Sequence, residues 1–454
     1  MALKDLLHNL PEVKGPEEKK LSFNVKLKWT LIILVSFFVL SNIPLAGLAG
    51  DALSRFEYLA ILLGTNFGSI ISLGIGPIVM ASIILQLLAG AQILNIDTKT
   101  TEGKKYFQGL QKLLAFAFVI FEAVVYVLMK GLQAEPGFAW LVILQLCFGG
   151  FLIIFMDEVV QKWGFGSGVS LFIAAGIGWR LFAQLFQFIG TQGTFEPVGK
   201  VLALVASVIA GDSTGVVIAL FPVLITAVLF LVVVWAQSLK VEVPLSFDRV
   251  RGYGIRWPLQ FFYASVLPVI LVSALAANLQ LAASLLENWL GHATFLGSFS
   301  NGTPVSGLAF WIHSTPILQS LITGSFRWIY ALQAVGHVLF YVVFSVLFAF
   351  FWVNTSGMDA RSQAKNIMSS GLSMPGFRKD ERVLESILKR YISPLTVMGG
   401  AAIGLLASVA NLLGALVGGT AILLAVMILY QLYQNIAQQH AVDINPALRG
   451  FFGG

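Results

Sequence analysis

The side chains that could do chemistry are few and widely spaced. The main polar members of the long apolar stretches are Ser82, Gln86, Glu122, Arg180, Asn278 and His337. Glu122 is the one clear carboxylate among them, and a lone buried carboxylate is more often hydrogen-bonded locally than part of a proton relay. The five histidines lack the spacing of metal ligands, and no nucleophile–base pair or phosphate loop is present. The sequence therefore predicts no enzyme, no metal site and no cofactor.

The elements that hold these side chains must lie in a membrane. Hydrophobic residues make up 57% and charged residues 11% of the 454 residues, the composition of a protein with many spans. Coupled transporters usually carry several ionisable groups near the middle of the bilayer, and this chain has few. A passive pathway is favoured, and a secondary solute transporter stays the alternative.

Apolar runs predict ten crossings, at about 29–48, 77–92, 109–130, 138–160, 168–189, 216–237, 258–279, 328–353, 394–413 and 416–434. An amphipathic N-terminus at 1–28 and a tail at 435–454 then both lie in the cytoplasm, and 280–326 lies outside. Of the 28 Lys and Arg, all but Arg55, Lys130, Arg180, Lys200 and Arg327 fall in segments assigned to the cytoplasm. That asymmetry is what the positive-inside rule demands.

The run from Tyr58 to Ile96 contains no charged residue, and it is too long for one span. Basic clusters on both sides of the first two spans require this run to cross only once. The sequence therefore predicts that about 55–68 dips into the membrane without crossing. Gly74, Gly76 and Pro77 separate this dip from the second span. Non-helical backbone at that depth indicates an aqueous cavity.

Two long cytoplasmic loops, 238–257 and 354–393, are rich in basic residues. These loops either only set the topology or bind an anionic macromolecular partner, since clustered Lys and Arg attract phosphate-rich surfaces. Composition alone leaves both interpretations open.

Five segments carry a resemblance to a known family. They are LGIGPIVMASIILQLL at 73–88, KWGFGSGVSLFIAAGIG at 162–178, LPVILVSALAANLQ at 267–280, MPGFRKDER at 374–382 and GGTAILLAVMILYQLY at 418–433. Together they resemble the pore-forming subunit of the Sec protein-translocation channel, the SecY family, and its archaeal branch most closely. The resemblance extends from the amphipathic N-terminus to the tenth span.

This resemblance implies an all-α polytopic membrane protein of ten transmembrane helices in two pseudo-symmetric halves. The halves would be 29–190 and 216–434, joined by an external hinge segment at 191–215. A re-entrant plug helix would occupy about 55–68, where the charge pattern also places a dip. Met80 stands where relatives often carry a polar side chain.

The resemblance also implies a function and its residues. The chain would translocate secretory polypeptides across the cell (plasma) membrane and release transmembrane segments sideways into lipid. The implied pore ring is Ile75, Val79, Val169, Ile173, Ile270 and Leu424. The implied polar cluster of a lateral gate between spans 2 and 7 is Ser82, Gln86, Glu122 and Asn278. The implied ribosome-docking residues are Arg249, Arg251, Arg361, Lys365 and Arg378. Further expected partners are small single-span SecE-type (gamma) and beta subunits, nascent polypeptides with signal sequences, and membrane lipid.

Overall fold

The computed structural model describes residues 10–17, 21–48, 68–90, 93–94, 100–129, 132–188, 198–247, 254–264, 267–300, 303–369, 372–373 and 380–444. The predicted plug at about 55–68 lies outside the described residues, apart from Gly68 at its end. Arg249, Arg251 and Arg378 also lie outside them.

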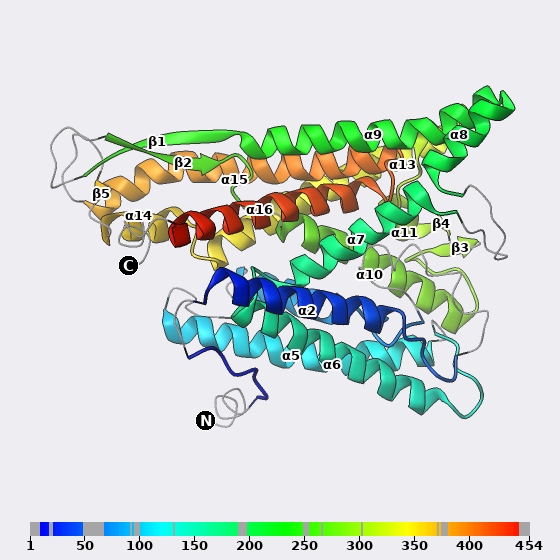
Figure 1. Cartoon of the computed structure of the whole chain (residues 1–454), viewed down its shortest axis with the longest axis horizontal. Helices are drawn as coiled ribbons and strands as arrows, with labels where there is room; N and C mark the ends of the chain where they lie inside the picture. The colour runs from blue at the N-terminus through cyan, green and yellow to red at the C-terminus, as the bar shows by residue number, and fades with distance from the viewer. Residues whose placement is uncertain are drawn as a thin grey trace.

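Long helices running side by side form most of the molecule (Figure 1). Within the described ranges, nine helical stretches are long and apolar enough to cross a membrane. They contain α2 (Phe23–Ser41), α5 (Thr101–Leu128), α6 (Ala139–Trp163), α7 (Gly168–Phe186), α9 (Ser213–Ser238), α10 (Leu267–Leu290), α13 (Trp328–Thr355), α15 (Glu381–Leu412) and α16 (Gly419–Ile444). The apolar helix α4 (Gly76–Gly90) is shorter, with 15 residues. Each of the ten predicted spans overlaps one of these helices.

The helix boundaries differ from those of the predicted spans, most of all at the seventh and the ninth. The seventh span begins at Leu267 rather than at 258, and it continues to Leu290, eleven residues past the predicted end at 279. Pro258 instead pairs with Glu242 in a β-ladder, at a position where proline's missing amide is tolerated. The ninth span begins at Glu381 and passes through Pro394 instead of starting there. Apolar composition alone cannot separate a strand or a helical extension from the span that it adjoins.

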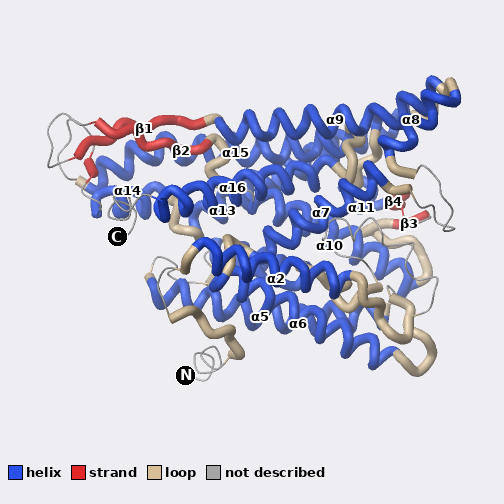
Figure 2. Tube along the Cα trace, viewed as in Figure 1, coloured by secondary structure: helices blue, strands red, loops and turns tan. Residues whose placement is uncertain are grey.

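Short strands and helices cover the two ends of the bundle (Figure 2). At one end, β1 (Lys240–Phe247) pairs antiparallel with β2 (Gly254–Gln260) and with β5 (Leu372–Ser373), and α14 (Ala360–Ser369) packs nearby. The opposite end carries α8 (Lys200–Ala210), the hairpin of β3 (Ser298–Ser300) and β4 (Thr303–Ser306), α11 (Gly307–Ile312) and α12 (Ile317–Ile322).

Among the described residues, most buried apolar side chains belong to one of two cores. The larger core runs through the bundle and includes residues of α2, α4, α5, α6, α7, α9, α10, α13, α15 and α16. The smaller core lies at the end that carries β1 and β2, and it joins those strands to α14, to the end of α13 and to the start of α15. The two basic loops predicted from the sequence are therefore parts of one folded unit.

Glycine allows α13 and α15 to touch backbone to backbone, as small residues do between membrane helices. A Cβ atom built on Gly404 of α15 would stand 2.6 Å from the carbonyl oxygen of Tyr341 in α13. One built on Gly400 would stand 3.1 Å from the carbonyl oxygen of Ser345. Any larger side chain at Gly404 must therefore push the two helices apart.

We expect Gly404→Val to lower the stability of the protein by about 1–3 kcal/mol, the usual cost of overpacking a close contact. The measurement is the thermal unfolding midpoint in detergent. Gly178→Ala in α7 is the control, because a Cβ there meets nothing within 4 Å. Equal midpoints for Gly404→Val and the wild type would contradict the close packing of α13 on α15.

Candidate functional site

The six predicted ring residues come from four helices of the main core. Ile75 immediately precedes α4 and Val79 lies within it, Val169 and Ile173 lie on α7, Ile270 lies on α10 and Leu424 lies on α16. Five are 3–5% exposed, and half-buried Val169 packs against the same core. Helix α10 contacts both α4 and α16, and α16 contacts α7. Their helices are thus neighbours, and the convergence of the six side chains on one constriction stays a prediction.

Two of the four predicted gate residues, Ser82 and Asn278, make hydrogen bonds within α4, within α10 or between α4 and α5. Ser82 of α4 donates to Ile78 O at 3.0 Å and accepts from Gln111 Nε2 of α5 at 2.6 Å. Asn278 donates to Ala274 O of its own helix at 2.8 Å. Glu122 is buried on α5. Gln111 was not predicted, because its role depends on a partner 29 positions away.

Two buried polar atoms near this region have no hydrogen-bond partner within the described part of the chain. They are Gln86 Oε1 on α4 and Ser273 Oγ on α10. Helices α4 and α10 pack against each other. Leaving a buried polar group unpaired costs roughly 1–3 kcal/mol, so such atoms mark places where the packing serves something other than stability. Ser273 was not among the predicted gate residues.

The two described docking candidates lie on one face of α14. Arg361 and Lys365 are exposed and stand four residues apart, while Ala364 and Ile367 on the other face enter the small core. The segment between β2 and α10 joins this unit, because the Tyr263 hydroxyl donates to Met358 O at 2.6 Å. Burial, with a smaller contribution from the charge of Asp359, raises the pKa of Tyr263, so the hydroxyl keeps its proton.

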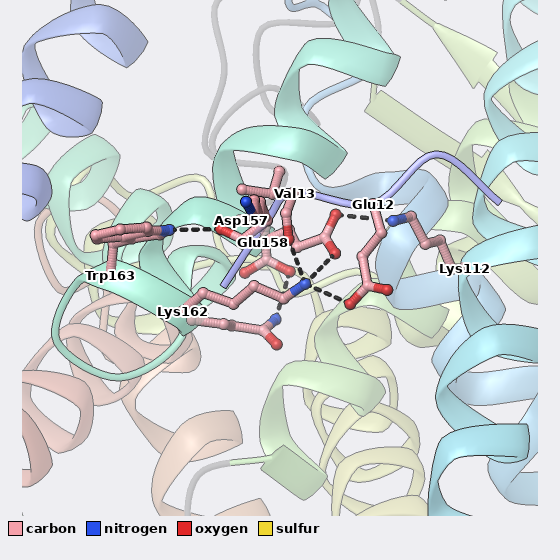
Figure 3. Close-up of polar contacts among 9 residues, drawn as sticks. Glu12, Val13, Lys112, Asp157, Glu158, Lys162 and Trp163 are labelled. Carbon is pink, nitrogen blue, oxygen red and sulfur yellow. Dashed lines mark hydrogen bonds and ion pairs between the residues drawn. The ribbon is translucent and has the colours of Figure 1, made fainter. Parts of the chain in front are cut away.

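A polar cluster that sequence reasoning missed ties the N-terminal segment to two helices (Figure 3). Glu158 of α6 bonds Lys112 of α5 at 2.8 Å and Lys162 at 3.0 Å. Lys162 also pairs with Glu12 and donates to the carbonyl oxygen of Val13 at 2.6 Å. The indole Nε1 of Trp163 donates to the carbonyl oxygen of Lys14 at 2.9 Å. Sequence alone could treat these lysines only as topology signals.

At the opposite end, two side chains of α13 hold the segment between α10 and α13. Gln333 Nε2 donates to Phe310 O at 2.8 Å, and one turn further on His337 Nδ1 lies 2.6 Å from Ile312 O. The other ring nitrogen of His337 lies 3.3 Å from Nδ2 of Asn411 in α15. His337 therefore has a structural role in fixing α11 and α15 to α13.

These observations define a class: a polytopic helical membrane protein with buried aliphatic side chains on four neighbouring helices and a basic folded unit at one end. The family model for SecY matches residues 69–433. The protein translocase subunit SecY of Methanothermobacter thermautotrophicus is 46% identical over 98% of this chain and 97% of its own length. That of Methanocaldococcus jannaschii is 38% identical over 98% of this chain and 97% of its own.

Solved structures agree with these matches. One titled as the structure of a protein conducting channel has a TM-score of 0.85 and 37% identity, covering 98% of this chain and 99% of its own. A Sec61 chain from a canine ribosome-channel complex has a TM-score of 0.81 and 36% identity, covering 98% and 99%. The chain belongs to the SecY family. The predicted family and helical membrane fold are confirmed, and the transporter alternative is not favoured.

His313, between α11 and α12, leads us to predict that stability depends on pH. Burial lowers the pKa of His313 from 6.5 to about 4. Between these values the unfolded chain binds a proton that the folded chain does not, so stability falls as the pH drops from 6.5 towards 4. We expect the unfolding midpoint to fall more between pH 7.5 and 5 in the wild type than in His313→Gln. Equal falls in the two proteins would show that His313 does not contribute.

Proposed function

We propose that this chain is the pore-forming subunit of a protein-conducting channel. It carries secretory polypeptides across the plasma membrane and releases transmembrane segments laterally into lipid. It does so without enzymatic activity of its own and without a cofactor. The observation that carries this proposal is the placement of buried aliphatic residues on four neighbouring helices of a SecY-family fold. A relative of the same fold is described as a protein conducting channel.

The proposed seal is the ring of Ile75, Val79, Val169, Ile173, Ile270 and Leu424. Branched apolar side chains exclude water and ions by dewetting, because water inside the ring would give up hydrogen bonds. The same side chains can yield sideways around an extended polypeptide. The plug at about 55–68 would support the closed ring from the external side.

The proposed lateral gate opens between α4 and α10. The bonds of Ser82 and Asn278 support this proposal, because they remain within one half or one helix and need not break on opening. Gln86 Oε1 and Ser273 Oγ are unpaired in the described residues and would gain partners once the interface is hydrated. Opening would then lose the apolar packing between α4 and α10, and it would let water hydrate the two unpaired polar groups.

The proposed partners follow from the surfaces. The folded unit of β1, β2, β5 and α14 would face the cytoplasm with both termini, and it would dock a ribosome, as a Sec61 relative does in a ribosome-channel complex. Its basic residues Arg249, Arg251, Arg361, Lys365 and Arg378 suit the phosphates of ribosomal RNA. Few side chains of the apolar helix α9 are buried, which leaves surface for lipid and for the SecE-type (gamma) and beta subunits.

We expect the double variant Ile270→Asn/Leu424→Asn to leak ions, because polar side chains lower the cost of hydrating the ring. The measurement is the conductance of purified channels in planar bilayers. Single alanine variants should leak less than the double variant, since neighbouring ring members can fill the space. Double-variant channels that insert normally and conduct no more than wild type would remove these two residues from the seal.

We expect charge reversal by Arg361→Glu/Lys365→Glu to weaken the binding of purified archaeal ribosomes by roughly tenfold and to reduce its salt dependence. Lys104→Glu/Lys105→Glu is the matched control, because both lysines are exposed near the start of α5 and the change in net charge is the same. Equal losses in the two variants would mean that net charge, not this face of α14, governs docking.

A further inference from the structure

Helix α7 begins without a cap of its own. Ser167 occupies the N-cap position with an extended backbone, and its side chain makes no capping hydrogen bond. The first amides of a helix have no partner inside the helix, and in most helices the N-cap side chain accepts from one of them. Something else must therefore bond the amides of Gly168 and Val169.

The carboxylate of Asp157 in the preceding helix, α6, takes that place. Val169 N donates to Asp157 Oδ1 at 2.9 Å, and the Gly168 amide bonds the same side chain. Gln161, one turn further along α6, donates to the second oxygen, Oδ2, at 2.8 Å. Asp157 is 7% exposed. The helix dipole also favours a negatively charged side chain at the N-terminus of a helix.

The contact between the two helices is too close for any residue but glycine at position 168. A Cβ on Gly168 would lie 2.6 Å from Asp157 Cα. The turn before it is held as well, because Phe165 N donates to Thr30 Oγ1 of α2 at 3.1 Å. The start of α7 is thus fixed against both α6 and α2.

The neighbouring carboxylate has a different role. Glu158 bonds Lys112 and Lys162, and it belongs to the cluster that holds the N-terminal segment (Figure 3). Asp157 and Glu158 are adjacent in sequence but point to different partners, one to a helix start and one to lysines. Their loss should therefore have different consequences.

We propose that Asp157 is a positioning residue for the seal. By capping α7 from α6, it sets the position of the turn that carries Val169 and, four residues later, buried Ile173. This inference rests on the proposed function, in which both side chains belong to the ring. Without the carboxylate, the first turn of α7 frays, Val169 leaves its place and water reaches the ring.

The test compares Asp157→Ala, Asp157→Asn and Ser167→Ala in the full chain. Amide hydrogen exchange reports the capping bond at Val169, and conductance in planar bilayers reports the seal. Asp157→Ala should exchange this amide roughly tenfold faster and leak ions, because one buried hydrogen bond is lost. Asp157→Asn keeps an acceptor oxygen of the same shape and should return both readouts towards wild type. Ser167→Ala, which changes the residue at the nominal cap, should change neither.

Wild-type exchange in Asp157→Ala overturns the inference, whatever the conductance. Faster exchange with wild-type conductance also overturns it and leaves the seal proposal intact, provided that Ile270→Asn/Leu424→Asn leaks. If that double variant does not leak either, the seal proposal fails and the inference fails with it. If Asp157→Ala does not fold, Gln161→Ala at an exposed position releases one carboxylate oxygen and should change both readouts in the same direction by a smaller factor.

Discussion

A helix leaves the backbone amides at its start unpaired, and in lipid there is no water to bond them. Other parts of the protein must therefore supply their hydrogen-bond partners. At two places in this protein, side chains from other helices accept these hydrogen bonds. Asp157 of α6 accepts from Val169 at the start of α7 at 2.9 Å. Gln184 of α7 accepts from Val417 N in the link between α15 and α16 at 2.8 Å. Helices α7 and α16 thus begin at places that side chains of neighbouring helices determine.

The link between α15 and α16 contains a strained backbone conformation. Val417 has a φ of 57°, a left-handed conformation that is strained for a β-branched residue. The amide before it, Leu416 N, donates to Thr226 Oγ1 of α9 at 2.9 Å. Thr420 N donates to Asn411 Oδ1 at 2.9 Å, and Leu424 follows one turn later. Two helices of the proposed ring, α7 and α16, therefore start at points set by side chains outside the ring.

This dependence explains what could be predicted from the sequence. The ten spans and the basic loops were predictable, because transfer free energy and charge belong to each segment by itself. The boundary at Pro258 was not, because apolar residues that pair in β2 resemble the start of a span. The bond between Gln184 and Val417 joins residues 233 positions apart and leaves no local pattern. The six ring positions came from the resemblance to the family, since aliphatic residues in a span have no signal of their own.

In the proposed orientation, the cytoplasmic ends of the two proposed halves are joined in different ways. In the first half, Lys112, Glu158 and Lys162 tie α5, α6 and the N-terminal segment together. In the second half, the small core and the bond from Tyr263 to Met358 O join both basic loops to α13, α15 and the segment that leads into α10.

Each of these two ends therefore has its own internal bonds, and α4 of the first proposed half contacts α10 of the second. The hydrogen bonds of Ser82 and Asn278 do not cross the contact between α4 and α10. A ribosome bound to the loops would push on a unit continuous with α10, and the resistance at the α4–α10 contact would come mainly from apolar packing. Apolar packing lacks direction and costs free energy in proportion to area, so it lets the halves separate gradually around segments of different size.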